Sequence, residues 1–119
     1  MKYITIDGDD VGRKITASYL RDDVAGLKQL SFELEATTKE IANLLTRHGF
    51  SLIFCAADGV AASSEHEHDF LEIFSQIQEI SPDTISFSAG VGSSLKDAYI
   101  ALLDAKSNGK NRLCNYSNS

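Results

Sequence analysis

With 119 residues, a formal net charge of -6 and 43% hydrophobic residues, the chain has the composition of one globular domain, spanning 1–119. The acidic balance argues against stable binding of nucleic-acid backbones, which requires clustered Lys and Arg. The longest apolar run, 52–57, is far shorter than the roughly 20 residues of a membrane-spanning helix, and no apolar signal segment follows Met1. The predicted location is therefore the cytoplasm, with no membrane partner, and Cys55 and Cys114 are expected to be reduced thiols in or near the core.

The first elements are a strand and two helices. Apolar and polar residues alternate over 2–7, which predicts a strand with two different faces. After a loop rich in Asp and Gly, residues 13–20 favour a short helix. A long crossover helix follows, which Asp22 or Asp23 can cap and which ends at the His48-Gly49 stop signal.

Two short apolar stretches then predict a β-hairpin. They cover 50–57 and 59–63 and enclose the dipeptide Asp58-Gly59. This dipeptide suits a tight turn, because both central residues of such a turn need a positive φ. We expect the chain to reverse direction there.

Beyond the hairpin, the sequence predicts a helix, a strand, a last helix and an edge strand, over 64–82, 84–91, 93–109 and 112–116. The stretch "SEHE", 64–67, resembles a capping box that starts the first of these helices. Ser93 or Ser94 can cap the last helix. The strand has one small, polar face that contains Ser86 and Ser88.

The order β-α-β-β-α-β is that of an α+β, ferredoxin-like fold. We expect an antiparallel sheet with helices on one face, followed by a C-terminal helix. In this topology the first and third strands are central, antiparallel neighbours. Asp7, at the end of the first strand, is therefore predicted to lie next to Asp58, at the start of the third.

Three carboxylates, Asp7, Asp9 and Asp10, stand close together after the first strand, where like charges repel. Asp7 and Asp58, converging among glycines, would form a site for a divalent cation, and Mg²⁺ favours one or two carboxylates together with substrate phosphate oxygens. Two simpler interpretations stay open. Asp9 or Asp10 can merely cap the following helix, and Asp58-Gly59 can be no more than a hairpin turn.

Two lysines near the C-terminus suggest an anion site. Lys106 lies four residues after Leu102 and seven after Tyr99, so it continues the apolar stripe of the last helix. Lys110, just past the end of that helix, can reach the same place. The alternative is that the Lys106 stem packs while its amine extends to water. Together with a metal site, the lysines favour a nucleoside triphosphate as ligand.

These motifs resemble a known family. The stretches "YITIDGDDVG", "FCAADGV" and "DAYIALLDAKSNGKNRL" are similar to the palm domain shared by GGDEF diguanylate cyclases and the large polymerase-like subunit of type III CRISPR complexes. The resemblance is closest to the stand-alone minimal CRISPR polymerases, or mCpol, and it covers nearly the whole chain. It implies a palm that makes cyclic nucleotide messengers from nucleoside triphosphates in antiviral defence signalling.

The resemblance also implies roles for individual residues. Asp7, the Gly8 carbonyl and Asp58 match the ligands of Mg²⁺ or Mn²⁺. The positions implied to contact the nucleotide are Gly8, Gly12, Lys106 and Lys110.

The chain departs from the GGDEF signature at three positions. Ala56 and Ala57 replace its glycines, and Gly59 replaces its fourth, acidic residue. Asp9 or Asp10 can compensate for the missing acid, so both join Asp7 and Asp58 as candidate catalytic residues.

The sequence leaves three functions to compare. The first is an enzyme in which a ribose hydroxyl attacks an α-phosphate and pyrophosphate leaves, while Lys106 and Lys110 stabilise its charge. The second is a degenerate palm that senses a nucleotide without chemistry, and the third is a structural domain with incidental carboxylates. Retention of Asp7, Asp58 and both lysines favours the enzyme.

The expected substrate is ATP. In the diguanylate cyclases an Asn and an Asp read guanine, and the corresponding positions here hold Ile15 and Thr16, which lack their hydrogen-bonding groups. The expected product is cyclic di-AMP, made by a homodimer with facing sites and read by a downstream effector. A GTP-using diguanylate cyclase is the alternative.

Overall fold

The computed structural model describes residues 1–117. Its elements are β1 (Lys2–Gly8), α1 (Val11–Leu20), α2 (Val24–Arg47), β2 (Ser51–Ala56), β3 (Gly59–Ser64), α3 (Phe70–Ile80), β4 (Phe87–Gly92), α4 (Leu95–Ser107) and β5 (Leu113–Asn115). The α+β fold and the predicted order of elements are confirmed, with a C-terminal helix and an edge strand after the ferredoxin-like unit. Within the described residues, no helix is both long enough and apolar enough to span a membrane.

The five strands form one sheet in the order β2-β3-β1-β4-β5. β1 lies in the middle and runs antiparallel to both β3 and β4, as the topology predicts. The four strands of the ferredoxin-like unit are antiparallel, as expected, whereas the added edge strand β5 runs parallel to β4. The reason is that α4 forms a crossover connection, which returns the chain to the same end of the sheet before β5 begins.

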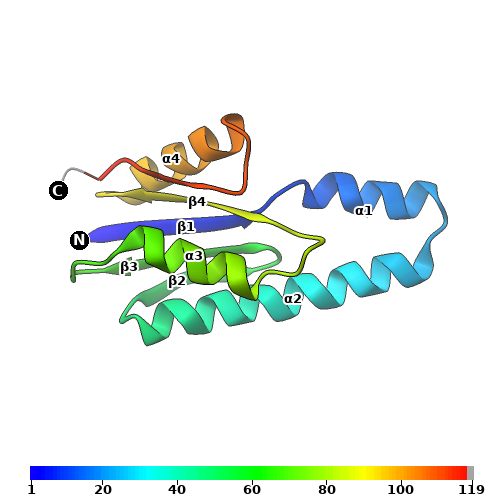
Figure 1. Ribbon diagram of the computed structural model, residues 1–119, viewed down its shortest axis with the longest axis horizontal. Helices are drawn as coiled ribbons and strands as arrows, with labels where there is room; N and C mark the ends of the chain where they lie inside the picture. Colours follow the sequence, from blue (N-terminus) through cyan, green and yellow to red (C-terminus); the bar gives the residue numbers. More distant parts are fainter. Residues whose placement is uncertain (118–119) are drawn as a thin grey trace.

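Helices cover the two faces of the sheet unequally. Figure 1 shows α2 and α3 on one side of the sheet and α4 on the other. The main hydrophobic core lies on the α2 and α3 side, where the largest fully buried side chains are Phe87, Ile4, Ile6, Ile41, Leu45, Ile73, Ile77, Ile85, Val60 and Val91. The two crossover helices therefore share one face, as expected, and the C-terminal helix takes the other.

α4 lies unusually close to the sheet. A Cβ atom added to Gly90 would lie 2.1 Å from the Ala98 carbonyl oxygen, and one added to Gly92 would lie 2.5 Å from the Ala98 nitrogen. The buried residues of α4 are correspondingly small, namely Ala98, Ala101, Leu102 and Ala105. Tyr99, expected on the buried stripe, is 56% exposed, because the narrow gap between helix and sheet has no room for an aromatic ring.

Local capping interactions set the helix ends. Asp23 and Ser94 cap α2 and α4 as predicted, each accepting a hydrogen bond from a backbone N–H in the first turn. α2 ends before Gly49, whose φ of 91° favours glycine. The predicted capping box at the start of α3 is wrong: Ser64 is the last residue of β3, and Asp69 caps the helix instead.

The hairpin turn is shifted by one residue from its predicted position. Ala57 and Asp58 form the turn, and only Ala57 has a positive φ, of 51°. Gly59 already belongs to β3, where it pairs with Asp7 of β1. The neighbouring Cys55 is exposed on the edge strand β2 and not in the core, because α2 covers this strand only in part.

We expect Gly90→Ala to destabilise the protein by about 3 kcal/mol, because the new methyl group overlaps backbone atoms of α4 and forces the helix away from the sheet. Urea unfolding of Gly90→Ala and Gly12→Ala measures this cost. Gly12 is the matched control, since a Cβ atom there meets nothing within 4 Å. Equal stability of the two variants would show that α4 can move at little cost.

Candidate active site

The end of β1 brings two carboxylates together. Asp7 pairs with Gly59 across the sheet, and the Gly8 N–H donates to the Asp58 carbonyl oxygen at 3.1 Å. A Cβ atom on Gly8 would lie 3.1 Å from Asp58 Oδ2, and one on Gly59 would lie 3.5 Å from Asp7 Oδ1. The predicted proximity of Asp7 and Asp58 is therefore present, and both carboxylates lie beside glycines that have no side chain to crowd them.

Asp7 and Asp58 repel each other in the free protein. Burial, and then the neighbouring Asp58 carboxylate, raise the pKa of Asp7, although Lys106 acts in the opposite direction. Ionised Asp7 is therefore held at an energetic cost that a cation placed between the two groups would relieve.

The donor set at this point suits a hard divalent cation. Two carboxylates, Asp7 and Asp58, lie beside the Gly8 carbonyl oxygen, and Mg²⁺ prefers such oxygens. Among residues 1–117, no three His, Cys, Asp or Glu side chains come together as a metal site. The fit therefore depends on further oxygens from water or a phosphate, which is how Mg²⁺ commonly binds in nucleotide sites.

Lys106 reaches this site from the last turn of α4. Its Nζ donates to the Gly8 carbonyl oxygen at 2.8 Å and to Asp9 Oδ1 at 3.2 Å, and it lies 3.3 Å from Asp7 Oδ2. The lysine side chain is only 23% exposed. The amine thus bonds within the carboxylate cluster, and the alternative in which it extends to water is not what the structure shows.

Asp9 has a different environment from Asp7. It is 2% exposed, and both of its carboxylate oxygens accept hydrogen bonds. The four donors are the hydroxyls of Ser86 and Ser88, each at 2.7 Å, the Asn111 N–H at 3.0 Å and Lys106. Burial by itself would raise the pKa of Asp9, but these donors hold it below its ordinary value. This arrangement favours a positioning role over direct contact with a metal.

Asp10 occupies the cap position of α1 without capping the helix. Its φ is 60°, and its side chain makes no bond to the helix N–H groups. The carboxylate instead pairs with Lys110 and, at 3.2 Å, with Arg13. The hydrogen bond from Lys110 is the main reason that the pKa of Asp10 is lowered. The first turn of α1, which contains Gly12, is left without a side-chain cap.

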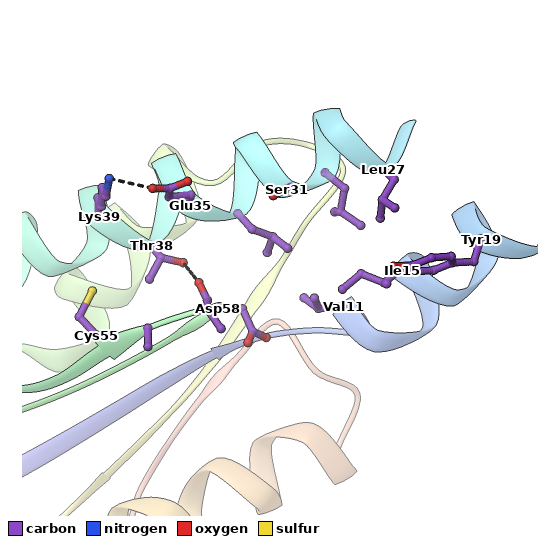
Figure 2. Close-up of a pocket in the computed structure, with 14 residues that line it drawn as sticks. Val11, Ile15, Tyr19, Leu27, Ser31, Glu35, Thr38, Lys39, Cys55 and Asp58 are labelled. Carbon is purple, nitrogen blue, oxygen red and sulfur yellow. Dashed lines mark hydrogen bonds and ion pairs between the residues drawn. The ribbon is translucent and has the colours of Figure 1, made fainter. Parts of the chain in front are cut away.

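A cavity of about 740 Å³ opens beside Asp58, between α1, α2 and the end of β2. Figure 1 shows that α1 and α2 extend together past the sheet, and Figure 2 shows side chains from both helices facing the space between them. Its apolar lining is Val11, Ile15 and Tyr19 from α1 and Leu27, Leu30 and Leu34 from α2. Ile15 thus lies on the cavity wall, whereas Thr16 is not among the lining residues.

Apart from Asp58, the polar part of the lining comes from α2, and sequence reasoning missed it. Ser31, Glu35, Thr38 and Lys39 line the cavity. Thr38 donates to the Ala57 carbonyl oxygen at 3.1 Å, while Glu35 and Lys39 form an exposed ion pair at 3.0 Å. The spacing of these residues along one helix was visible in the sequence, but nothing there indicated that α1 would stand opposite them.

We expect Asp9→Ala to lower the free energy of unfolding by about 3 kcal/mol at neutral pH, because several buried donors lose their acceptor. The loss should be much smaller for Asp10→Ala, which removes a more exposed carboxylate one residue away. Denaturant titrations of both variants provide the comparison.

The contribution of Asp9 to the free energy of unfolding should depend on pH in a defined direction. Since folding lowers the pKa of Asp9, its stabilisation is complete above the ordinary value of 3.8 and disappears as the pH falls through the lowered value. The stability difference between wild type and Asp9→Ala should therefore shrink in acid. A difference that grows in acid would contradict this description of Asp9.

Solved structures with a similar fold include GGDEF domains. The active GGEEF domain of a diguanylate cyclase from Vibrio cholerae superposes with a TM-score of 0.71 at 20% identity, over 99% of this chain and 83% of the other. The GGDEF domain of DgcB from Caulobacter crescentus, solved with c-di-GMP, gives 0.64 at 15% identity, over 96% and 76%. An EAL/GGDEF domain protein from M. capsulatus gives 0.66 at 20%, over 98% and 84%. These similarities establish the palm fold.

Sequence comparison establishes the family. Residues 3–116 match the minimal CRISPR polymerase domain, mCpol. Among curated proteins, none is similar enough in sequence to be matched. The chain belongs to the mCpol family, and its family and palm fold support a nucleotide polymerase or cyclase type of function.

Proposed function

We propose that this protein joins two molecules of ATP into cyclic di-AMP, a diffusible messenger for antiviral defence. The observation that carries the proposal is the position of the Asp7 and Asp58 carboxylates. They lie between an apolar cavity large enough for a nucleobase and two lysines suited to a triphosphate. A nucleotide that spans these features would have its α-phosphate near the carboxylates.

The proposed reaction is a nucleotidyl transfer. A ribose hydroxyl of one nucleotide attacks the α-phosphorus of the other, a new P–O bond forms, the bond to pyrophosphate breaks, and the hydroxyl proton passes to solvent. Bound by Asp7, Asp58 and the Gly8 carbonyl, Mg²⁺ or Mn²⁺ would lower the pKa of the attacking hydroxyl and neutralise charge on the phosphoryl oxygens.

The protein's own groups would hold the triphosphate and its leaving group. Lys106, which lies 3.3 Å from Asp7, and Lys110, which pairs with Asp10, would stabilise the departing pyrophosphate. The uncapped first turn of α1, where Gly12 leaves open space, offers backbone N–H groups to a phosphate.

The cavity supports adenine over guanine. On the α1 side its wall is made by Val11 and Ile15, which give a nucleobase packing but no hydrogen bonds. Apolar walls discriminate weakly between bases, whereas guanine selection depends on placed donors and acceptors. Adenine has fewer polar groups than guanine to leave unpaired beside such a wall, so it loses less binding free energy.

Because one palm has one proposed site, closing a ring of two nucleotides calls for a second copy of the protein. Each chain offers one pair of carboxylates, and a cyclic dinucleotide contains two equivalent phosphodiester bonds. A two-fold homodimer with facing sites would provide both reactions. The effector in this proposal meets only the released product.

One observation favours a different function. Gly59 stands where the GGDEF signature has an acidic residue, and within β3 its position offers no oxygen except the backbone carbonyl. A palm that has lost this acid could bind a nucleotide and signal through a partner without chemistry. Retention of the Asp7–Asp58 pair supports the enzyme over this sensor.

Incubation with Mg²⁺ and ATP, followed by mass spectrometry, should give pyrophosphate and a cyclic product. Asp7→Asn and Asp58→Asn should abolish formation of this product while the fold is retained.

The stability of Asp7→Asn shows whether its fold is retained. Because folding raises the pKa of Asp7, its ionised form costs stability at neutral pH, so Asp7→Asn should unfold at the same or a higher denaturant concentration than wild type. Wild-type turnover in either variant would refute the metal assignment, and binding of ATP without any product would support the sensor.

Base preference is tested by competition. With equal ATP and GTP, we expect a product that contains mostly adenine, with relaxed selectivity because the wall that α1 contributes to the cavity is apolar. Ile15→Asn introduces a hydrogen-bonding side chain on that wall and should raise the share of guanine. A wild-type product made mostly of guanine would identify a diguanylate cyclase instead.

A further inference from the structure

The Lys106 amine makes two hydrogen bonds and a further ion pair, all of them inside the carboxylate cluster. An ammonium group has three N–H donors. Nζ lies 2.8 Å from the Gly8 carbonyl oxygen, 3.2 Å from Asp9 Oδ1 and 3.3 Å from Asp7 Oδ2. All three neighbouring oxygens belong to the cluster, so a triphosphate that contacts Lys106 has to compete with them for the amine.

Two of the three oxygens that hold Lys106 belong to the proposed metal donor set. These are the Gly8 carbonyl and Asp7 Oδ2. We propose that Lys106 is an internal counter-ion, which competes with the divalent cation for Asp7 and the Gly8 carbonyl until the oxygens of a triphosphate draw it away. This inference rests on the proposed function in taking Asp7, Asp58 and Gly8 as the metal donors.

Asp9 is suited to be the fixed point of this exchange. Three further donors hold its carboxylate in place, so it stays where it is whether or not Lys106 is bound to Asp7. The lysine can therefore keep its contact with Asp9 Oδ1 while its other two N–H groups turn from Gly8 and Asp7 to phosphate. Its flexible four-carbon stem allows such a turn without movement of α4.

The charges favour the exchange only when a triphosphate is present. With Lys106 in place, a divalent cation would sit within contact distance of an ammonium group and share its oxygens, where repulsion is strong. A triphosphate adds the negative charge that lets both cations remain. Binding of metal and of triphosphate is then mutually dependent, and the coupling is reciprocal. The free protein would load little metal without substrate.

Mn²⁺ binding in the absence of any nucleotide tests the proposal, by electron paramagnetic resonance of the free ion. Lys106→Met should bind Mn²⁺ about tenfold more tightly than wild type, or more, because a competing charge is removed and two oxygens are freed. Lys96→Met is the matched control, since it removes the same charge from an exposed position on the same helix. It should leave Mn²⁺ affinity nearly unchanged.

A double variant identifies where the extra affinity arises. In Lys106→Met/Asp58→Asn the gain should disappear, because one of the proposed metal ligands is gone. If Lys106→Met does not fold, Lys106→Gln is used in its place, since it keeps a neutral donor for Asp9.

Equal or weaker Mn²⁺ binding by the Lys106 variant, including no binding by either protein, would overturn the proposal. The proposal would also be overturned if Lys96→Met raised the Mn²⁺ affinity equally, or if the higher affinity persisted in the double variant. The readout is separate from turnover. If the protein makes no cyclic product but Lys106→Met still binds Mn²⁺ more tightly, the proposed enzymatic function is refuted and the counter-ion role of Lys106 is supported. If the protein makes the product but Lys106→Met shows no gain in Mn²⁺ affinity, the counter-ion role is refuted and the enzymatic function is supported.

Discussion

The buried carboxylate of Asp9 is the interaction on which the site depends. It joins three parts of the chain that are far apart in sequence: the end of β1, the start of β4 through Ser86 and Ser88, and the loop after α4 through Asn111. That loop contains Lys110 and Asn111, both with positive φ, a conformation that costs energy in residues other than glycine. The hydrogen bonds from Asn111 to Asp9 and Ser88 hold the loop in it.

The short distance between α4 and the sheet is the second feature on which the site depends. Because Gly90 has no side chain, the helix backbone lies almost in contact with β4, and the alanines of α4 fill the remaining space. This packing places the last turn of α4 beside the end of β1, within reach of Gly8 for a lysine side chain. Bulkier residues between helix and sheet would move Lys106 away from the carboxylates.

The nucleotide side of the site follows from a different property, the sparse packing of α1. In contrast to the other helices, α1 has no buried residue, and it packs against α2 beyond the end of the sheet. Apolar side chains on both helices therefore line an open cavity instead of a closed core (Figure 2). The site thus combines a rigid part, built on β1, β4 and α4, with a loosely packed part that offers apolar surface.

What the sequence determined by itself was local or followed from topology. Alternation and helical spacing predicted the elements. The known connectivity of the ferredoxin-like fold then placed Asp7 beside Asp58, because the end of one of two antiparallel neighbours lies beside the start of the other. The motif at 97–113 also indicated that Lys106 and Lys110 lie near these carboxylates. Each of these predictions used residues close in sequence, or strands whose pairing was already implied.

Only the tertiary structure decided which side chains are buried and which partners they contact, since both depend on distances between elements. Asp9 and Asp10 are adjacent in sequence and chemically identical, yet one is buried among four donors and the other pairs with Lys110 and Arg13. The exposure of Tyr99 required knowledge of how closely α4 approaches the sheet. Cys55 is exposed because it lies on an edge strand that α2 covers only in part, and Ser31 and Glu35 face a cavity because α1 and α2 leave space between them. Burial and partner choice of this kind come from the packing of the whole chain, which local pattern does not contain.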